Sequence, residues 1–326
     1  MGVEISVKNH ELAAYMAKEL MEDKLLVVIV GPTAVGKTAL CVTLAQLFGT
    51  EIISADSRQF FKEMAIGTAK PTVEEMDGVV HHFVDHMSVD TPYSAGRFEL
   101  DALAKAKTLF ATHDTVIATG GSTLYIKGLV EGFDDMPKTP EAVRAQVIAD
   151  YEEKGLEFLV KELWANDPAY ADEVDLQNPQ RVMRAVEVFR VSGQPMSFYR
   201  KNKLDARPFK MLKIGLERER EELYDRINRR VDIMIEQGLF EEVERLLPYR
   251  EVNALQTVGY KEVFDYMDGQ YDREEAIRLL KRNTRRYAKR QLTYFKKDEE
   301  FHWFHPEDEA GIVALIREHL KGEVKE

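Results

Sequence analysis

The sequence contains a single cysteine among its 326 residues. One cysteine excludes an intrachain disulfide and any zinc site built from cysteine pairs, and no zinc-finger spacing is present. Such cysteine usage is typical of a cytoplasmic protein, which is the localisation we expect. We interpret the one cysteine, Cys41, as a small buried residue.

Long hydrophobic runs are also missing. The longest, residues 25–30, is far too short to span a bilayer. Residues 1–24 carry charged side chains throughout and have no apolar core, so we predict no secretory signal and no membrane partner. Apolar residues at helical spacing predict a short amphipathic helix in this segment (Leu12, Tyr15, Met16, Leu20).

Basic residues are outnumbered by acidic ones, 45 to 57, which gives a formal net charge of -12. On this balance alone, a nucleic-acid partner is disfavoured. Net charge is a weak test, however, because binding needs only a local basic stripe. The apolar fraction of 44% argues against disorder.

Strand and helix patterns alternate in the first part of the chain. Short apolar runs predict strands at residues 25–30, 51–56, 115–119 and 209–216, and helical periodicity lies at 38–47 and 96–112. This alternation predicts an α/β fold: a P-loop-containing parallel sheet core flanked by helices. Ligands in such sheets bind at the carboxyl ends of the strands.

The pattern then becomes helical. Helical periodicity dominates from about residue 134 to 199, and further helices are predicted at 220–237, 240–247, 261–268 and 274–296. We therefore predict an N-terminal helical extension at 1–24 and an all-helical insertion domain at 132–205. The catalytic core would comprise residues 25–131 and 206–326 and would end in basic helices.

A phosphate-binding loop follows the first predicted strand and opens a helix. Its sequence GPTAVGKT matches the P-loop pattern in the context that the motif requires, with Gly31, Pro32, Thr33, Ala34, Val35, Gly36, Lys37 and Thr38. Backbone N–H groups, the helix N-terminus and Lys37 attract phosphate, and the Thr38 hydroxyl can ligate Mg²⁺. The sequence therefore predicts a phosphate site with a metal position at Thr38.

The loop alone does not say which phosphates it holds. Nucleotide triphosphatases place a metal-binding acid after a buried strand, whereas the strand at 115–119 is followed by Gly120 and Gly121. This absence weakens the ATPase interpretation and leaves a diphosphate as the alternative. Asp56 ends the second strand, where it could accept a proton, help to hold a metal, or cap a turn.

An ordered set of motifs makes the pattern specific. After GPTAVGKT come SADSRQFF (54–61), IGTAKPT (66–72), YSAGRF (93–98), ATGGSTLYIKGL (118–129), NPQRVMRAVEV (178–188) and VGYKE (258–262). In this order they resemble the tRNA dimethylallyltransferase (tRNA isopentenyltransferase) family in its short bacterial form. The resemblance extends from the P-loop to about Lys297 and implies transfer of a dimethylallyl group from dimethylallyl diphosphate to N6 of the adenosine at position 37, beside the anticodon. Mg²⁺ is the implied cofactor.

The resemblance also implies roles for particular residues. The P-loop would hold the diphosphate leaving group, with Lys37 and Mg²⁺ at Thr38 offsetting its charge. Asp56 would act as general base or would orient the adenine amine. An arginine of the helix at 220–237 would reach the diphosphate, and we favour Arg226 slightly over Arg230.

Contacts with the anticodon stem-loop are implied on both predicted domains. In the core they are Asp56, Ser57, Arg58, Gln59 and Ser122, and Ser122 could equally be a helix N-cap. In the insertion they are Arg144, Gln180, Arg181, Val182, Met183 and Arg184, where Arg144 alone would pass for an ordinary solvated arginine.

A basic stripe near the C-terminus supports an RNA partner. Between residues 278 and 297 there are nine basic residues and no acid: Arg278, Lys281, Arg282, Arg285, Arg286, Lys289, Arg290, Lys296 and Lys297. Such a face can follow a phosphate backbone, although a solvated helix balanced by acids elsewhere has the same sequence pattern. We interpret the polar stretch His81, His82, Asp85 and His86 as structural hydrogen bonding rather than a metal site.

Two rival functions remain open. One is isopentenyl transfer to a free adenine nucleotide, and the other is a P-loop small-molecule kinase or phosphate-sensing module. The helical insertion and the basic stripe favour tRNA, because a free nucleotide needs neither. A monomer would suffice for the reaction.

Overall fold

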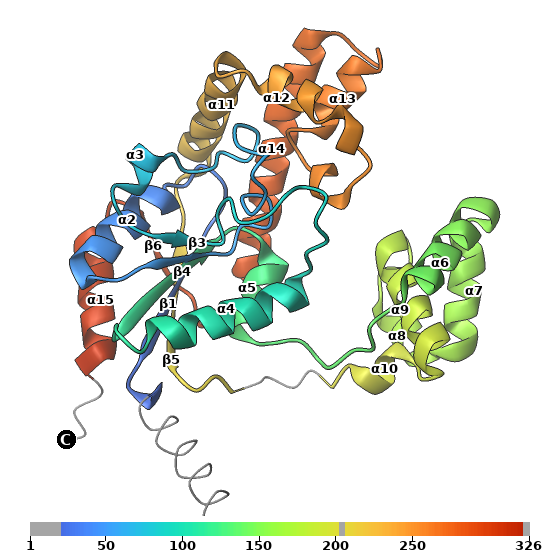
Figure 1. Ribbon diagram of the computed structural model, residues 1–326, viewed down its shortest axis with the longest axis horizontal. Helices are drawn as coiled ribbons and strands as arrows, with labels where there is room; N and C mark the ends of the chain where they lie inside the picture. The colour runs from blue at the N-terminus through green and yellow to red at the C-terminus, as the bar shows by residue number, and fades with distance from the viewer. Residues whose placement is uncertain (1–20, 202–205, 322–326) are drawn as a thin grey trace, which may run out of the picture. The chain divides into compact units, whose positions relative to one another are not determined.

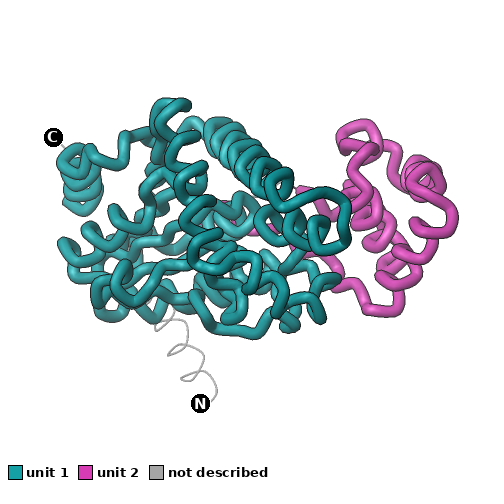
Figure 2. The backbone as a smooth tube through the Cα atoms, turned by 90° about the horizontal axis from the view of Figure 1, so that it is seen from above, with its two compact units in different colours: residues 1–130, 207–326 teal, residues 131–206 magenta. Residues whose placement is uncertain are grey.

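The computed structural model describes residues 21–201 and 206–321. The chain divides into two compact units, one formed by residues 1–130 and 207–326 and the other by residues 131–206 (Figure 2). The helix predicted from residues 12–20 lies outside the described residues. Within the described ranges, no helix is both long enough and apolar enough to cross a membrane.

The first unit is built on a parallel sheet of six strands in the order β3-β2-β4-β1-β5-β6 (Figure 1). This arrangement confirms the predicted α/β class. The strands are β1 (Leu25–Val30), β2 (Ile52–Ser54), β3 (His81–His82), β4 (Thr115–Gly120), β5 (Lys210–Leu216) and β6 (His302–Phe304).

Helices cover both faces of the sheet (Figure 1). All six residues of β1 are fully buried, because alternate side chains enter two different cores. One core includes Leu25, Val27 and Ile29 with residues of α2 (Lys37–Phe48) and α15 (Glu309–Lys321). The other includes Leu26, Val28 and Val30 with residues of α4 (Ala95–Leu109), α5 (Thr123–Val130) and α14 (Arg273–Phe295).

The remaining helices of this unit are short, apart from α11. They are α3 (Val73–Met76), α11 (Arg220–Glu236), α12 (Leu239–Arg245) and α13 (Lys261–Met267), with 3-10 turns at Leu247–Tyr249 and Asn253–Leu255.

The parallel register brings three strand ends to one edge of the sheet. Val30 pairs with Gly120, and Ser54 pairs with Thr119. The segments that follow these strands are the phosphate loop, the Asp56 turn and the Gly121–Ser122 turn. They therefore lie side by side at the edge where ligands bind in such sheets.

The C-terminal strand and helix were not predicted. β6 has only three residues, too few for a clear apolar pattern. It pairs with β5, where Trp303 lies against Gly215, and a Cβ at Gly215 would come 2.6 Å from the indole ring. Ile312 and Ile316 of α15 are fully buried in the core on the α2 side of the sheet.

The second unit is all-helical, as predicted for this part of the chain. It comprises α6 (Glu141–Lys154), α7 (Leu156–Asn166), α8 (Pro168–Glu173), α9 (Pro179–Ser192) and α10 (Met196–Tyr199). Its own core includes Val147, Leu159, Val182 and Val188, which are all fully buried. Asn178 caps α9 by accepting the N–H of Arg181 at 3.3 Å, and Pro179 follows at the first helical position.

Candidate functional site

The phosphate loop has the conformation that its glycines predict. Gly36 adopts φ 118° directly before α2, which begins at Lys37. Gly31 packs so closely on β5 that a Cβ there would lie 2.8 Å from the carbonyl oxygen of Leu216. Ala34 has a left-handed φ of 66°, a conformation that costs about 1–2 kcal/mol without glycine. Contacts from elsewhere in the chain must therefore hold the loop in this shape.

Side chains from α14, from α11 and from the segment just before α11 bind three consecutive loop residues. The N–H of Thr33 donates to Oε1 of Gln291 at 3.0 Å. Arg226 donates through Nε to the carbonyl oxygen of Ala34 at 2.8 Å, and Arg218 donates through Nε to that of Val35, also at 2.8 Å. These three contacts hold the loop from distant parts of the chain.

Lys37 lies folded over the loop. Its Nζ donates to the carbonyl oxygens of Gly31 and Pro32, each at 2.9 Å. Burial lowers the pKa of Lys37 to about 8, although the negative charge of Asp56 raises it, and Arg230 lowers it further. Lys37, Asp56 and Arg230 therefore share one electrostatic environment.

Arg230 and Arg226 are one turn apart on α11, and both are partly buried. Burial lowers the pKa of the Arg230 guanidinium, while Glu75 and Asp56 raise it and Arg226 lowers it. Arg226 is bonded to the phosphate loop, and Arg230 interacts with the charge of Asp56. A contact of either arginine with a bound diphosphate stays a prediction.

The Asp56 carboxylate closes its own turn, because Oδ1 accepts the N–H of Arg58 at 3.0 Å. The next residue, Ser57, is bound to Ser122. The Ser57 N–H donates to Oγ of Ser122 at 2.9 Å, and the Ser122 hydroxyl donates to Oγ of Ser57 at 3.0 Å. The main-chain carbonyl oxygen of Ser122 accepts the N–H groups of Tyr125 and Ile126 in the first turn of α5. Its side chain links the Asp56 turn to the turn that follows β4.

Two further side chains surround Asp56. Burial lowers the pKa of Arg58, and Tyr125, Asp56 and Tyr287 raise it. Burial raises the pKa of Tyr287 to about 12, and the charge of Asp56 raises it as well. Tyr287 belongs to α14, so the basic helix also supplies part of this site.

Gln59 has a structural role beside the Asp56 turn. Its Nε2 donates to the carbonyl oxygens of Thr68 and Ala69, both at 3.2 Å. This contact holds together the two motifs at 54–61 and 66–72. A contact with tRNA at Gln59 stays a prediction.

A buried carboxylate holds the start of the motif at 66–72. Glu242 accepts the N–H groups of Ala65, Ile66 and Gly67 at 3.1, 2.8 and 2.9 Å, and the Tyr260 hydroxyl at 2.7 Å. A Cβ at Gly67 would lie 2.7 Å from the Tyr260 ring. The motif containing Tyr260 is therefore explained by packing, since it supports the loop beside the site.

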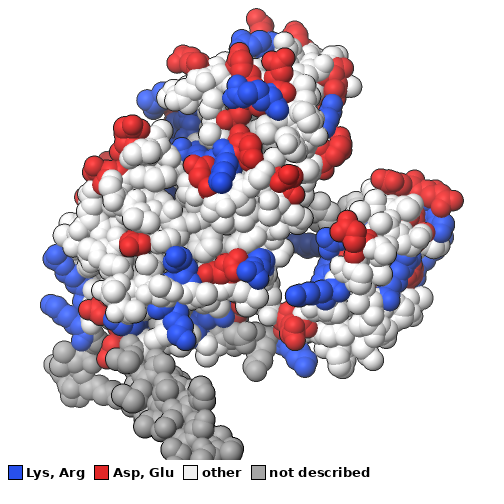
Figure 3. Space-filling view, viewed as in Figure 1, with Lys and Arg blue, Asp and Glu red and all other residues white. Residues whose placement is uncertain are grey.

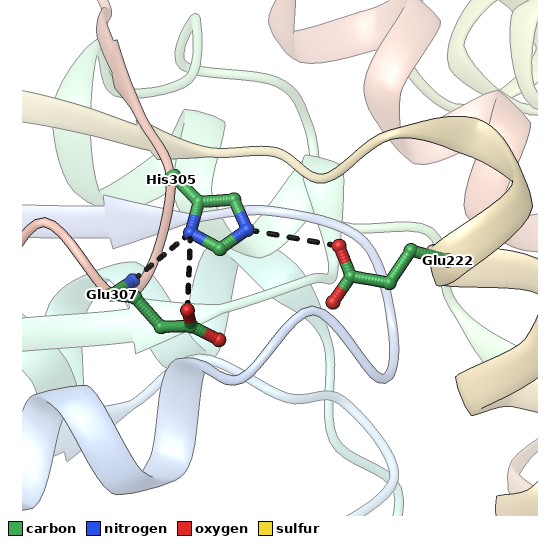
Figure 4. Close-up of side chains that lie close together, drawn as sticks. All are labelled: Glu222, His305 and Glu307. Atoms are coloured by element: carbon green, nitrogen blue, oxygen red, sulfur yellow. Dashed lines mark hydrogen bonds and ion pairs between the residues drawn. The ribbon is translucent and has the colours of Figure 1, made fainter.

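A cluster of two acids and a histidine lies beside the phosphate loop (Figure 4). Ligand atoms of Glu222, His305 and Glu307 lie within 4.8 Å of one another. The guanidinium of Arg218 already bonds all three: Nη1 lies 3.1 Å from Glu307, 3.2 Å from Nε2 of His305, and donates to Glu222. We therefore interpret the cluster as the support that fixes Arg218 on the carbonyl of Val35.

The histidine-rich segment does make structural hydrogen bonds. His81 Nδ1 lies 3.0 Å from the carbonyl oxygen of Val79, and His82 Nε2 lies 2.5 Å from Oε2 of Glu51. Cys41 is fully buried, and burial raises the pKa of its thiol to about 11. The histidines thus make the structural hydrogen bonds, and Cys41 has the buried position, that the sequence predicts.

Neighbouring acids or amides already hold some of the basic residues of α14. Arg278 pairs with Glu275, Lys281 with Asp232 and Lys296 with Glu217, and Arg285 donates to Asn228. Exposed Arg286 and Lys289 have no ion pair within the described residues. On the face of the first unit in Figure 3, acidic and basic side chains are intermixed.

In the helical unit the predicted contact residues differ in accessibility. Arg144, Gln180 and Arg181 are exposed, whereas Met183 and Arg184 are half-buried. Arg144 and Arg184 both pair with the buried Glu187, at 3.3 and 3.2 Å. The Val182 side chain is fully buried in the core of the unit, which assigns it to packing rather than to a direct side-chain contact.

Sequence reasoning missed Gln291, Arg218 and the site role of Tyr287. Arg218 lies in a loop between strand and helix and gives no signal of its own. Gln291 does give a signal in the sequence, because it is a polar residue on the face of α14 that also carries the buried Ala288 and Phe295. A buried polar side chain at such a position requires hydrogen-bond partners.

Comparisons with known proteins show which family the chain is similar to. The IPP transferase family model matches residues 59–298. The tRNA dimethylallyltransferase of Cytophaga hutchinsonii is 52% identical over 299 residues, covering 92% of this chain and 98% of that protein. The crystal structure of the full-length tRNA isopentenylpyrophosphate transferase from Bacillus halodurans has a TM-score of 0.69 at 38% identity and covers 92% and 97% of the two chains.

A eukaryotic dimethylallyltransferase, captured in crystallographic snapshots acting on tRNA, has a TM-score of 0.70 at 28% identity, covering 83% of this chain and 69% of that chain. The family match spans well over half of the sequence and includes the chain from Gln59 onward, with the whole of α11 and α14. This chain belongs to the IPP transferase family.

Proposed function

We propose that this chain transfers a dimethylallyl group from dimethylallyl diphosphate to N6 of the adenosine at position 37 of tRNA, which is 3′-adjacent to the anticodon. The products are N6-dimethylallyladenosine and diphosphate. The observation that carries the proposal is the joining of the phosphate loop to the Asp56 turn at one edge of the sheet, with no acid directly after β4. A group bound in the loop would thus have a carboxylate beside it rather than a triphosphatase metal ligand.

Stabilisation of the leaving group is the first task of the site. The bond between the allyl carbon and the diphosphate oxygen breaks, and the electron pair leaves with the diphosphate. Backbone N–H groups of the phosphate loop that are not already bonded to protein, together with Lys37, Arg226 and Arg230, would place positive charge where this negative charge develops. Their geometry is fixed before the substrate arrives, so little reorganisation is needed during the reaction.

The metal position fits the same task. Mg²⁺ prefers hard oxygen ligands and retains several waters beside a phosphate. The Thr38 hydroxyl, in the first turn of α2, is such a ligand. The Asp56 carboxylate lies close enough to the loop for its charge to act on the neighbouring Lys37. When bound at Thr38, Mg²⁺ would supply further positive charge to the diphosphate.

Positioning of the acceptor is the second task. The exocyclic amine of adenine is a poor nucleophile, because its lone pair is delocalised into the ring, so alignment counts at least as much as proton removal. Asp56 would accept a hydrogen bond from N6 and then its proton as the new C–N bond forms. The adenine must leave the stack of the anticodon loop to reach this carboxylate.

Contacts with the tRNA would come from both units. Ser57, Arg58 and Ser122 lie beside Asp56, while Arg144, Gln180, Arg181, Met183 and Arg184 offer exposed or partly exposed groups on the helical unit. Arg286 and Lys289 of α14 would bind backbone phosphates. We propose that the enzyme works in the cytoplasm and as a monomer.

The decisive experiment offers the purified chain tRNA or AMP as acceptor, with dimethylallyl diphosphate and Mg²⁺. We expect a mass gain of one dimethylallyl group on tRNA at position 37 and none without the prenyl donor. Prenylation of AMP with unmodified tRNA would instead establish the free-nucleotide transferase. ADP formation from ATP with an added acceptor, without prenyl transfer, would establish a kinase.

A further inference from the structure

Gln291 is a polar side chain held inside the first unit. Only 3% of the residue is exposed, although it belongs to α14, whose other positions include many charged residues. Its oxygen accepts the N–H of Thr33 at 3.0 Å, and its Nε2 donates to the carbonyl oxygen of Gly121 at 2.8 Å. One amide therefore joins the phosphate loop to the turn that follows β4.

Gly121 leaves room for this contact. A Cβ at position 121 would lie 2.2 Å from Nε2 of Gln291. This distance is too short for two non-bonded atoms, so any other residue at position 121 would displace the Gln291 amide. The neighbouring Gly120 is equally constrained, because a Cβ there would lie 2.5 Å from the carbonyl oxygen of Ala55. The paired glycines thus allow α14, the turn and the Asp56 strand to approach one another closely.

A path of hydrogen bonds and peptide links passes through this amide. It begins at Thr33 in the phosphate loop and crosses Gln291 to Gly121. Ser122, the next residue, binds both the N–H and the hydroxyl of Ser57 at 2.9 and 3.0 Å, and Ser57 directly follows Asp56. The path therefore connects the loop that would hold the donor to the carboxylate that would hold the acceptor.

The contact with Thr33 also uses one N–H group of the phosphate loop. In a phosphate-binding loop such groups normally point toward the ligand. Here the N–H of Thr33 is satisfied by protein, so it contributes to the position of the loop instead of to the charge around the ligand.

We propose that Gln291 is a positioning residue that sets the alignment of the allyl carbon with the adenine N6. The inference rests on the proposed prenyl transfer. Alignment matters because the allyl carbon becomes strongly electrophilic as diphosphate leaves. If N6 is not in line, a water oxygen can form the new bond to carbon, which releases dimethylallyl alcohol and a proton to solvent.

The test uses Gln291→Met, which keeps the side-chain length but removes both hydrogen bonds. The matched control is Thr50→Val, which removes a buried hydrogen bond of 2.5 Å from Thr50 to the carbonyl of Thr115, at the opposite end of β4. Each change should lower the melting temperature through loss of one or two buried hydrogen bonds. Prenylated tRNA and dimethylallyl alcohol are then measured in the same reaction, well below both melting temperatures.

For Gln291→Met we expect kcat to fall at least 10-fold, with small changes in KM for both substrates and a larger share of dimethylallyl alcohol among the products. Thr50→Val should keep the product ratio of the unmodified enzyme. Equal kcat losses in the two variants, with an unchanged product ratio, would reduce Gln291 to a purely structural role and overturn the inference.

Gln291→Glu provides a second variant if Gln291→Met does not fold. A carboxylate still accepts the Thr33 N–H but faces the Gly121 carbonyl without a donor, so the product ratio should shift in the same direction. A normal product ratio in this variant would contradict the inference. The unmodified enzyme separates this inference from the proposed function, because its failure to prenylate tRNA would refute the proposed function instead.

Discussion

Arg226 donates through Nε to the carbonyl oxygen of Ala34 at 2.8 Å, and Ala34 has a left-handed φ of 66°. This hydrogen bond helps to hold Ala34 in its strained conformation. It also fixes the Arg226 guanidinium against the phosphate loop. Because Nε makes this bond, the two Nη groups are oriented by it. Arg226 is thus suited to shape the loop and to contact a diphosphate within it.

Replacing Arg226 by lysine should separate charge from geometry. Arg226→Lys keeps the positive charge but loses the planar group, and we expect kcat/KM for dimethylallyl diphosphate to fall about 100-fold, as for other single preorganised donors. The measurement is steady-state prenylation of tRNA at varied donor concentration. Arg229→Lys is the control, because Arg229 is exposed and pairs with Asp225 on the outer side of α11. Normal activity in Arg226→Lys with a large loss in Arg230→Lys would move the diphosphate contact to Arg230.

Asp56→Asn should impair turnover far more than tRNA binding. Asparagine retains an oxygen for the N–H of Arg58, so the turn is preserved, but it cannot accept a proton from N6. We expect kcat to fall by about 10²–10⁴-fold, with the tRNA dissociation constant little changed. Rapid-quench turnover and filter binding supply the two values. Asp114→Asn, a change at an exposed acid near the start of β4, is the control, and equal losses of turnover and affinity would contradict a catalytic role for Asp56.

Salt dependence should identify the basic residues that bind RNA phosphates. Arg286→Ala and Lys289→Ala should each reduce the slope of log K against log salt by about 1, because each removes one phosphate contact. Arg278→Ala should change the slope much less, since Arg278 is already held by Glu275 through bonds of 2.6 and 2.5 Å. Binding titrations of tRNA over a range of salt concentrations measure all three. A slope unaffected by the first two substitutions would exclude Arg286 and Lys289 from the RNA contact.

Acid should destabilise the helical unit through Asp150. Hydrogen bonds from Lys154 at 2.9 Å and from Arg190 at 2.7 Å lower the pKa of this carboxyl from 3.8 to about 2. Between these pH values the unfolded chain binds the proton more readily, so the free energy of unfolding falls as pH drops from 3.8 toward 2. Above pH 3.8 the full contribution is present.

Asp150→Asn should flatten this part of the stability curve and lower stability near neutral pH. Trp164 lies in α7 of the helical unit, so its fluorescence in a Trp303→Phe background can follow urea unfolding of that unit. Asp172→Asn serves as control, because Asp172 is exposed and has no ion pair among the described residues. Parallel pH profiles for Asp150→Asn and the parent chain would refute the assignment.

Local patterns in the sequence determined most of the strands, most helices and the phosphate loop, but not the short C-terminal strand β6. β1 and the loop depend on neighbouring residues: a run of buried apolar side chains, glycines where φ is positive, and a helix start at Lys37. The position of Asp56 at a strand end was equally readable, because parallel strands end at a common edge. The ordered motifs then indicated the family.

Only the tertiary structure decided what holds these parts together. Gln291 meets Thr33 across 258 residues and Arg226 meets Ala34 across 192, and no local pattern encodes such pairings. The same is true of α14, where tertiary packing pairs Lys281 with Asp232 and Lys296 with Glu217. Sequence specifies which side chains are available, but the balance of burial, hydrogen bonding and charge depends on which distant elements pack beside them.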